Sequence, residues 1–216
     1  MARPAQYTAQ GILDAAAELA AVSGPAKTTL GAIAESLDAP TGSIYHRFRS
    51  KDVLLAELWL QTVESFQTGF QAALAGAEPR AAGLDAALHT PRWVRSHPVP
   101  ARLLLLHNRE DFVAGVWPAE VIQRASEVTE RGQAALDSFT RRVMRSTSAP
   151  ARRRARFAVV ELPVAAVLPH LRADERPPPS IERLIADAYH GVIENPRGNQ
   201  GSSEMAARFA SAGGAG

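Results

Sequence analysis

The sequence predicts an all-α protein, and three observations support this. Apolar residues recur at spacings of three and four over long stretches such as 59–74 and 121–143. Capping residues and prolines stand near the ends of these stretches. No stretch shows the strict alternation of a half-buried strand. With 216 residues, 46% of them hydrophobic and 21% charged, the chain can bury a sizeable core in one or two domains.

Three short helices are expected in the first fifty residues. Thr8 and Thr29 are residue types that cap helix N-termini, so they mark the starts of the first two helices. Ser23-Gly24-Pro25 ends the first. Asp38 stands where the chain must turn sharply, and aspartate tolerates left-handed backbone angles better than most residues. Pro40 fits the first turn of the third helix, where a missing N–H costs nothing.

A larger set of helices is expected to follow. Ser50 predicts the cap of a long fourth helix. A loop is expected over 76–83, then a fifth helix over about 84–96 that stops at His97-Pro98. The fourth helix carries one strongly apolar stripe, made of Trp59, Val63, Phe66, Phe70 and Leu74.

From residue 100 onward the sequence predicts a short apolar segment and three more helices. Pro100 opens a short apolar segment, and Trp117-Pro118 begins another long helix. Two helices follow over about 151–171 and 180–193, and Pro163 should kink the first of them. Residues 196–216 are rich in Gly, Ser and Ala, which predicts a mobile tail.

The segment from Thr28 to Lys51 carries the most specific chemical pattern. It predicts two short helices joined by a tight turn, and the second begins with the small residues Thr41, Gly42 and Ser43. Small side chains let a helix enter the major groove of DNA, while nearby cations and hydroxyls grip the phosphates. Arg47, Arg49 and Lys51 concentrate positive charge directly after this helix. The pattern therefore predicts a helix-turn-helix reader of DNA.

This segment resembles the DNA-binding domain of TetR-family (tetracycline-repressor-type) transcriptional regulators. The resemblance covers roughly residues 8–60. The residues that carry it, in chain order, are Thr28-Thr29, Ile33-Ala34, Gly42-Ser43-Ile44-Tyr45, Phe48 and Lys51.

The resemblance implies roles for individual residues. Thr41, Gly42 and Ser43 would face base edges, with Pro40 at the start of the same helix. Thr29, Tyr45, His46 and Lys51 would bind phosphates, whereas Ile44 and Phe48 would be core. The chain departs from the family pattern at Asp38, usually glycine, and at Pro40, usually a polar cap. Independently of the resemblance, the small side chains at 41–43 offer few base hydrogen bonds, so specificity would rest on methyl contacts, bridging water and DNA shape.

The family resemblance also implies a ligand-responsive regulator, most often a repressor, that acts as a homodimer on operator DNA. We expect a DNA-binding domain over 1–50 and an effector-binding and dimerisation domain over 51–195. The effector would be mainly apolar, and its candidate contacts are Trp59, Phe66, Phe70, His89, Trp93 and Arg109, with Arg92 as a further polar group. The dimer interface would use the last two helices, through Phe157, Val160, Val164, Leu168, Ile181, Leu184, Ile185, Ala188 and Val192.

Several signals have plainer interpretations. Tyr45 alone could be a core aromatic residue, and the aromatic residues of the fourth helix could be ordinary core. The arginine-rich run 152–156 favours a solvated face over a second nucleic-acid patch. Residues 107–111 hold metal-capable types without a recognised ligand spacing, so a surface turn is the better interpretation.

Composition limits the remaining function classes. The chain has no cysteine, which excludes disulfides and thiolate sites. No apolar run is long enough to span a membrane, and residues 1–7 lack a signal-peptide core, which predicts a cytoplasmic protein. The net charge is +2, and 22 of the 24 basic residues are arginine. No catalytic motif, metal site or cofactor site is recognisable. Two alternatives remain, a small-molecule sensor or carrier whose head no longer binds DNA, and a helical enzyme using Glu110 or Asp111.

Overall fold

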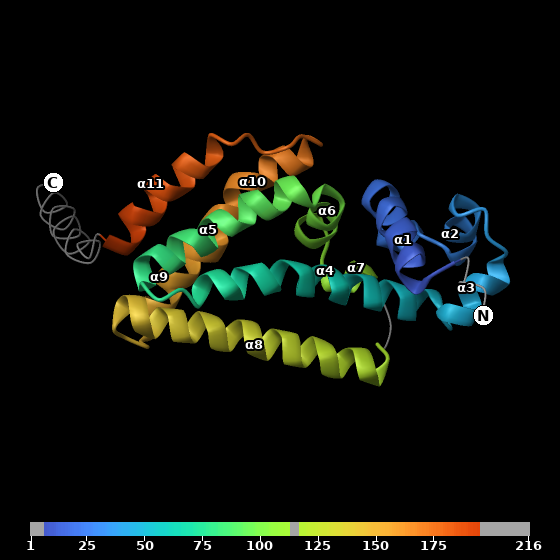
Figure 1. Ribbon diagram of the computed structural model, residues 1–216, viewed down its shortest axis with the longest axis horizontal. Coiled ribbons are helices and arrows are strands. Elements are labelled where there is room, and N and C mark those ends of the chain that lie inside the picture. Colours follow the sequence, from blue (N-terminus) through green and yellow to red (C-terminus); the bar gives the residue numbers. More distant parts are fainter. Residues whose placement is uncertain (1–6, 113–116, 195–216) are drawn as a thin grey trace, which may run out of the picture.

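The computed structural model describes residues 7–112 and 117–194, and this part is helical, without strands (Figure 1). The all-α prediction is therefore confirmed. The expected tail over 196–216 and residues 1–6 lie outside the described residues. The helices are α1 Ala9–Ser23, η1 Pro25–Lys27, α2 Leu30–Ser36, α3 Thr41–Arg47, α4 Lys51–Leu74, α5 Pro79–Ser96, α6 Pro98–Leu106, α7 Arg109–Phe112, α8 Ala119–Met144, α9 Ala149–Arg156, the π-helix η2 Phe157–Glu161, α10 Leu162–Arg172 and α11 Ile181–Glu194.

Helices α1 to α3 form a compact head at one end of the molecule (Figure 1). The predicted caps are confirmed, because the Thr8 hydroxyl accepts a hydrogen bond from the Gly11 N–H and the Thr29 hydroxyl from the Ala32 N–H. Ile12, Ile33 and Ile44 are fully buried between the three helices. Each head helix thus has a defined start and one apolar face.

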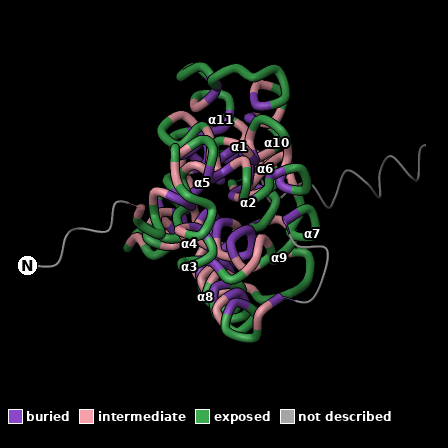
Figure 2. The backbone as a smooth tube through the Cα atoms, turned by 90° about the vertical axis from the view of Figure 1, so that its right-hand side faces the viewer, coloured by how far each residue is buried: buried purple, intermediate pink, exposed green. Residues whose placement is uncertain are grey.

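Helix α4 connects this head to the rest of the molecule. Ser50 caps it, as predicted, by accepting from the Val53 N–H. Its first turns contribute Leu54, Leu55 and Leu58 to the same buried cluster as the head. The helix is 24 residues long in all, and its later turns run into the body, where α5 and α8 pack along it. Figure 2 shows buried residues lying where neighbouring helices face one another, with exposed residues on the outer surfaces.

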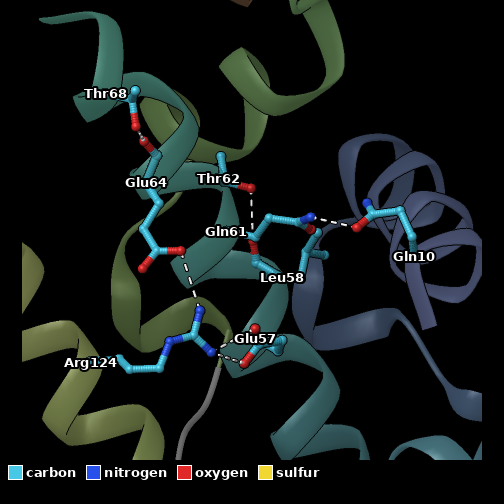
Figure 3. Close-up of polar contacts among 8 residues, drawn as sticks. All are labelled: Gln10, Glu57, Leu58, Gln61, Thr62, Glu64, Thr68 and Arg124. Carbon is cyan, nitrogen blue, oxygen red and sulfur yellow. Dashed lines mark hydrogen bonds and ion pairs between the residues drawn. The ribbon is translucent and has the colours of Figure 1, made fainter. Parts of the chain in front are cut away.

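Polar bonds tie α4 to its neighbours on two sides (Figure 3). Arg124 of α8 donates to Glu57 at 2.8 Å and to Glu64 at 3.3 Å, two carboxylates that lie two turns apart on α4. These contacts raise the pKa of Arg124 above its ordinary value, chiefly through the hydrogen bond to Glu57. On the other side, Gln61 donates to Gln10 of α1 at 2.7 Å. Helix α4 is therefore bonded to both head and body.

The predicted loop over 76–83 is too long, because only residues 75–78 separate α4 from α5, which begins at Pro79. Glu78 caps this helix through bonds from the Arg80 and Ala81 N–H groups, which lower the pKa of its carboxyl. Gly83 lies inside the helix rather than in a loop. A Cβ built there would lie only 2.2 Å from the Tyr189 hydroxyl and 2.5 Å from Phe139, so glycine is required by close packing. Helix α6 likewise starts at Pro98, two residues before the expected position.

The predicted kink at Pro163 takes the form of a widened turn. Residues Phe157 to Glu161 form a π-helix between α9 and α10, and the Leu162 N–H bonds to the Phe157 carbonyl five residues back. Proline has no N–H and its ring crowds the preceding turn. The regular series of i→i−4 backbone hydrogen bonds is therefore interrupted at this point. The expected single helix over 151–171 is therefore three consecutive segments.

The two helices expected at a dimer interface present only part of the predicted apolar stripe. Ile181 and Ile185 are buried inside the subunit, so the prediction that they face a partner is wrong. Leu184 is 67% exposed and Phe157 43% exposed. These two side chains, with the half-buried Ala188, lie on the outward side of the last helices.

Candidate DNA interface and internal cavity

Asp38 closes α2 by a complete C-terminal cap. Its φ of +49° is left-handed, its N–H bonds to the Glu35 carbonyl, and the Ala39 N–H bonds to the Ala34 carbonyl at 2.9 Å. This pairing of backbone bonds is the Schellman motif, which usually has glycine at the left-handed position. The Tyr7 hydroxyl donates to the Asp38 carbonyl at 2.9 Å, so the start of the described chain secures the same turn.

Helix α3 presents small residues to solvent at its start. Thr41 and Gly42 are exposed and Ser43 is half-buried, whereas Ile44 is fully buried beneath them. A Cβ built on Gly42 would meet no atom within 4 Å. The fold therefore does not require glycine at this position, although glycine weakens a helix. Pro40 lies one residue before α3 instead of in its first turn, and it provides no side-chain cap.

The aromatic and basic residues of α3 point outward. Tyr45 is 55% exposed, which excludes the interpretation that it is a core aromatic residue. His46, Arg47 and Arg49 are exposed as well, while Phe48 is buried. Exposed hydroxyl, imidazole and guanidinium groups beside a small-residue helix start are suited to phosphate contacts.

Thr29 and Lys51 are already bonded within the head. The Thr29 hydroxyl serves as the cap of α2. Lys51 donates from Nζ to the Ala26 carbonyl at 2.6 Å, across 25 residues of sequence. An ammonium has three donors, so two remain for a further acceptor such as a phosphate oxygen.

A cavity of about 370 Å³ lies in the body, between α4, α5, α6, α8 and the η2–α10 segment. Its volume falls within the range typical of small-molecule sites. Phe66 and Phe70, two of the predicted ligand contacts, line it and stack on one another at 5.6 Å between ring centroids. The residues that form its wall are Val63, Phe66, Gln67, Phe70, Thr90, Leu104, Leu105, Thr129, Gly132, Gln133, Leu136, Arg156, Val159, Val160 and Val164.

His89 and Trp93 lie behind this wall rather than in it. The His89 ring packs against Phe66 and Phe70, and its Nε2 lies 3.0 Å from the Phe66 carbonyl oxygen, so Nε2 must carry the proton. Burial lowers the pKa of His89, and the hydrogen bond to Phe66 opposes this shift only in part. Trp93 is buried and meets the edge of Phe66 at 5.2 Å. Both residues pack against the Phe66 ring and so fix its position, but neither lines the cavity.

The prediction that Trp59 and Arg109 share this cavity is wrong. They form a separate cluster with Trp117, in which the Arg109 guanidinium lies 4.3 Å from the centre of the Trp117 ring. Arg92 is also elsewhere, paired with Glu182 at 2.9 Å. Residues 107 and 108 precede the short helix α7 and residues 109–111 belong to it, and no cluster of metal-ligating side chains occurs within residues 7–112 and 117–194.

Sequence reasoning missed Arg156 and Gln133 as cavity residues. Arg156 belongs to the arginine-rich run that we interpreted as a solvated face, and Arg152 and Arg153 of that run are indeed exposed. Arg156 is exposed too, but it also lines the cavity. Arg153 and Arg156 are three residues apart and share a helical face, so their spacing does not distinguish them, and the widened turn that follows Arg156 is not visible in the periodicity.

Among the residues that the structure describes, no helix is both long and apolar enough to cross a membrane. The family model described as "Bacterial regulatory proteins, tetR family" matches residues 12–58, which run from α1 into the first turns of α4. No curated protein matches the sequence significantly.

Solved structures share the fold over most of the chain. A tetR family transcription regulator from Shewanella sp. PV-4 is 19% identical, with a TM-score of 0.63 over 86% of this chain and 95% of its own. PfmR from Thermus thermophilus is 18% identical, with a TM-score of 0.67 over 87% and 96%. FadR from Bacillus subtilis, solved in complex with stearoyl-CoA, is 15% identical, with a TM-score of 0.62 over 86% and 98%.

Proposed function

We propose that the chain, whose head matches the tetR family model and whose fold is shared with tetR-family regulators, is a ligand-responsive transcriptional repressor. A homodimer would bind operator DNA in the cytoplasm and leave it when a small molecule occupies the body. The head would comprise residues 1–50 and the effector-binding and dimerisation body residues 51–195. The proposed role is binding without catalysis.

One observation supports this proposal above all others. Helix α4 is continuous for 24 residues, is separated from α3 by Phe48, Arg49 and Ser50 alone, and contributes part of the cavity wall. A ligand that moves α4 must therefore also act on the start of α4, next to the DNA-facing helix. Coupling through one rigid element satisfies the physical requirement for allostery.

The proposed DNA contacts follow from the exposed surface of the head. Thr41, Gly42 and Ser43, preceded by Pro40, would approach base edges. Thr29, Tyr45, His46 and Lys51 would contact phosphates. Dimers of helix-turn-helix proteins reach half-sites about one helical turn apart, roughly 34 Å, so a second subunit is needed for tight binding.

The proposed dimer would pair the outward faces of the last helices. Leu184 on α11 and Phe157 on η2 are the exposed large apolar side chains of these helices, and covering them in an interface would favour association. The arrangement would hold the two heads at a fixed separation, which the effector could change.

The proposed effector is mainly apolar, because nine of the cavity residues are Val, Leu or Phe. The FadR structure, whose ligand is stearoyl-CoA, supports a molecule with a long acyl chain as one class to test. Phe66 and Phe70 would contact the apolar part directly, while His89 and Trp93 would hold Phe66 in place.

A second candidate function is a small-molecule sensor whose head does not bind DNA. Two observations favour it: Asp38 places a carboxylate at the turn before α3, and residues 39–46 contain no arginine or lysine. Both features reduce the positive potential that a DNA-binding surface needs.

Selection of bound DNA from a random pool separates the two functions. A repressor is expected to enrich a palindromic site, which is then measured by fluorescence anisotropy with and without stearoyl-CoA and a panel of apolar molecules. An effector should weaken operator binding by roughly 5–150-fold, and the operator should weaken effector binding by the same factor. Failure to enrich any sequence would favour the sensor.

A further inference from the structure

Arg156 is the one charged side chain among the described residues that line the cavity. It is an exposed residue, as is Gln133, whereas much of the remaining wall is formed by Val, Leu and Phe side chains. A cavity with an apolar interior and a cation at its opening is complementary to a molecule with an apolar tail and an acidic head.

The guanidinium of Arg156 is held by a carboxylate of the same segment. Its Nε donates to Glu161 Oε1 at 3.2 Å, and the two side chains are 56% and 49% exposed. In a regular α-helix, side chains three and four apart are neighbours, whereas side chains five apart diverge. The widened turn over Phe157–Glu161 brings these two together. Such π turns occur frequently at functional sites.

We propose that the effector is an acidic amphiphile whose carboxylate displaces Glu161 from Arg156 and whose apolar tail fills the cavity. The proposal rests on the proposed function only in taking the cavity as the effector site. Glu161, which is not itself a residue of the cavity wall, then pairs with the Arg156 guanidinium in the unliganded protein. Because the ion pair is half-exposed and therefore weak, its replacement by a second carboxylate costs little.

The other candidate cations do not compete for this role. Arg109 packs on the Trp117 ring and Arg92 pairs with Glu182, and neither lines the cavity. Arg152, in the same arginine-rich run, pairs with Asp137 at 3.5 Å and also lies outside the cavity wall. Replacing Arg152 therefore removes an equal charge near the cavity without removing a wall residue, which provides a matched control.

The test uses the fluorescent fatty acid cis-parinaric acid and its methyl ester, titrated into the full-length protein without DNA. Arg156→Gln should weaken binding of the acid about 2- to 5-fold, the range expected for the loss of a half-exposed ion pair. Glu161→Gln should strengthen it several-fold, because the competing carboxylate is gone. Arg152→Gln should change it less than about twofold. The ester should bind the natural protein and all three variants with similar affinity.

Circular dichroism and sedimentation on each variant check that fold and assembly are unchanged. An acid that binds no better to Glu161→Gln than to the natural protein, or that binds Arg156→Gln equally well, overturns the proposal, as does absence of binding by the acid. These titrations contain no DNA. Acid binding with the expected pattern but without operator release would therefore support the acidic ligand and contradict the proposed function alone.

Discussion

Lys51 and Ala26 are joined by a hydrogen bond of 2.6 Å, from the ammonium at the start of α4 to a carbonyl of η1. The bond crosses the head and fixes the segment that leads into Thr29. Lys51 therefore stabilises the head through this hydrogen bond and is also a proposed phosphate contact. A phosphate contact makes DNA affinity depend on salt concentration, whereas the bond to Ala26 does not, so the salt dependence of binding distinguishes the two roles.

For Lys51→Ala, we expect the slope of log affinity against log salt to fall by about one per half-site, since each phosphate contact contributes about 0.9 to that slope. The measurement is fluorescence anisotropy on the selected operator between low and high salt. A lower affinity with an unchanged slope would mean that Lys51 acts only through Ala26.

The Gly42→Ala variant is expected to have opposite effects on the stability of the head and on its affinity for DNA. A Cβ at this position has open space around it, so alanine should stabilise the free protein by up to about 1 kcal/mol through helix propensity. The same methyl group should weaken operator binding, because it lies between α3 and the base edges. Thermal unfolding and anisotropy measure the two effects.

Gly31→Ala is the matched control for Gly42→Ala. Gly31 holds the corresponding second position of α2, is exposed, and its Cβ would meet only the Thr29 hydroxyl, at 3.9 Å. It should gain similar stability and retain full DNA affinity. Equal DNA affinity for natural protein and Gly42→Ala would remove Gly42 from the interface.

The head could be predicted from sequence more fully than the cavity, because its signals are local. Thr8, Thr29 and Ser50 cap helices through bonds within three residues, and Asp38 turns the chain by its own backbone preference. Such local preferences can be recognised in a single sequence. The body depends on contacts between distant residues, as Gly83 shows, since its close packing against Tyr189 and Phe139 is not visible in the sequence around it.

The ligand contacts illustrate the same limit. Trp59 and Phe70 fall on one predicted stripe of α4, yet eleven residues of helix separate them by about 16 Å along its axis. The cavity wall includes Phe70 but not Trp59, which joins Trp117 and Arg109 instead. Periodicity predicts which face of a helix a residue occupies. It does not predict which neighbouring element the residue meets at its position along the helix axis.

Asp38 should limit both stability and DNA affinity. Asp38→Gly should stabilise the head by up to about 1 kcal/mol, because glycine adopts the left-handed angle without strain. It also removes an acid near the DNA, so affinity should rise. Asp38→Asn removes the charge but retains a side chain. Its DNA affinity should match that of the glycine variant, whereas its stability should be lower than that of the glycine variant. An unchanged affinity in both variants would place Asp38 away from DNA.

His89 predicts a pH-dependent stability of the body. Its pKa is lowered in the folded protein, chiefly by burial, so the unfolded chain binds the proton more readily. The contribution of neutral His89 is fully present above about pH 6.5, the ordinary histidine value, and is lost as the pH falls toward the lower folded pKa.

Denaturant unfolding from about pH 8 to about pH 5 measures this loss. His89→Gln keeps an N–H donor for the Phe66 carbonyl but does not titrate, so its stability should decline less steeply below about pH 6.5. Parallel declines in both proteins would show that other groups cause the pH dependence.

The proposed dimer is tested on the outward face of α11. Leu184→Arg combined with Ala188→Arg would place charges in an apolar interface without touching the subunit core, where Ile181 and Ile185 lie. Sedimentation should show monomers, and specific DNA binding should be lost while helicity persists. The control is Ala134→Arg with Ser138→Arg, an exposed pair at the same spacing on α8. If the α11 double variant remains dimeric while binding operator normally, the subunits pair through other helices, and the head separation is set elsewhere.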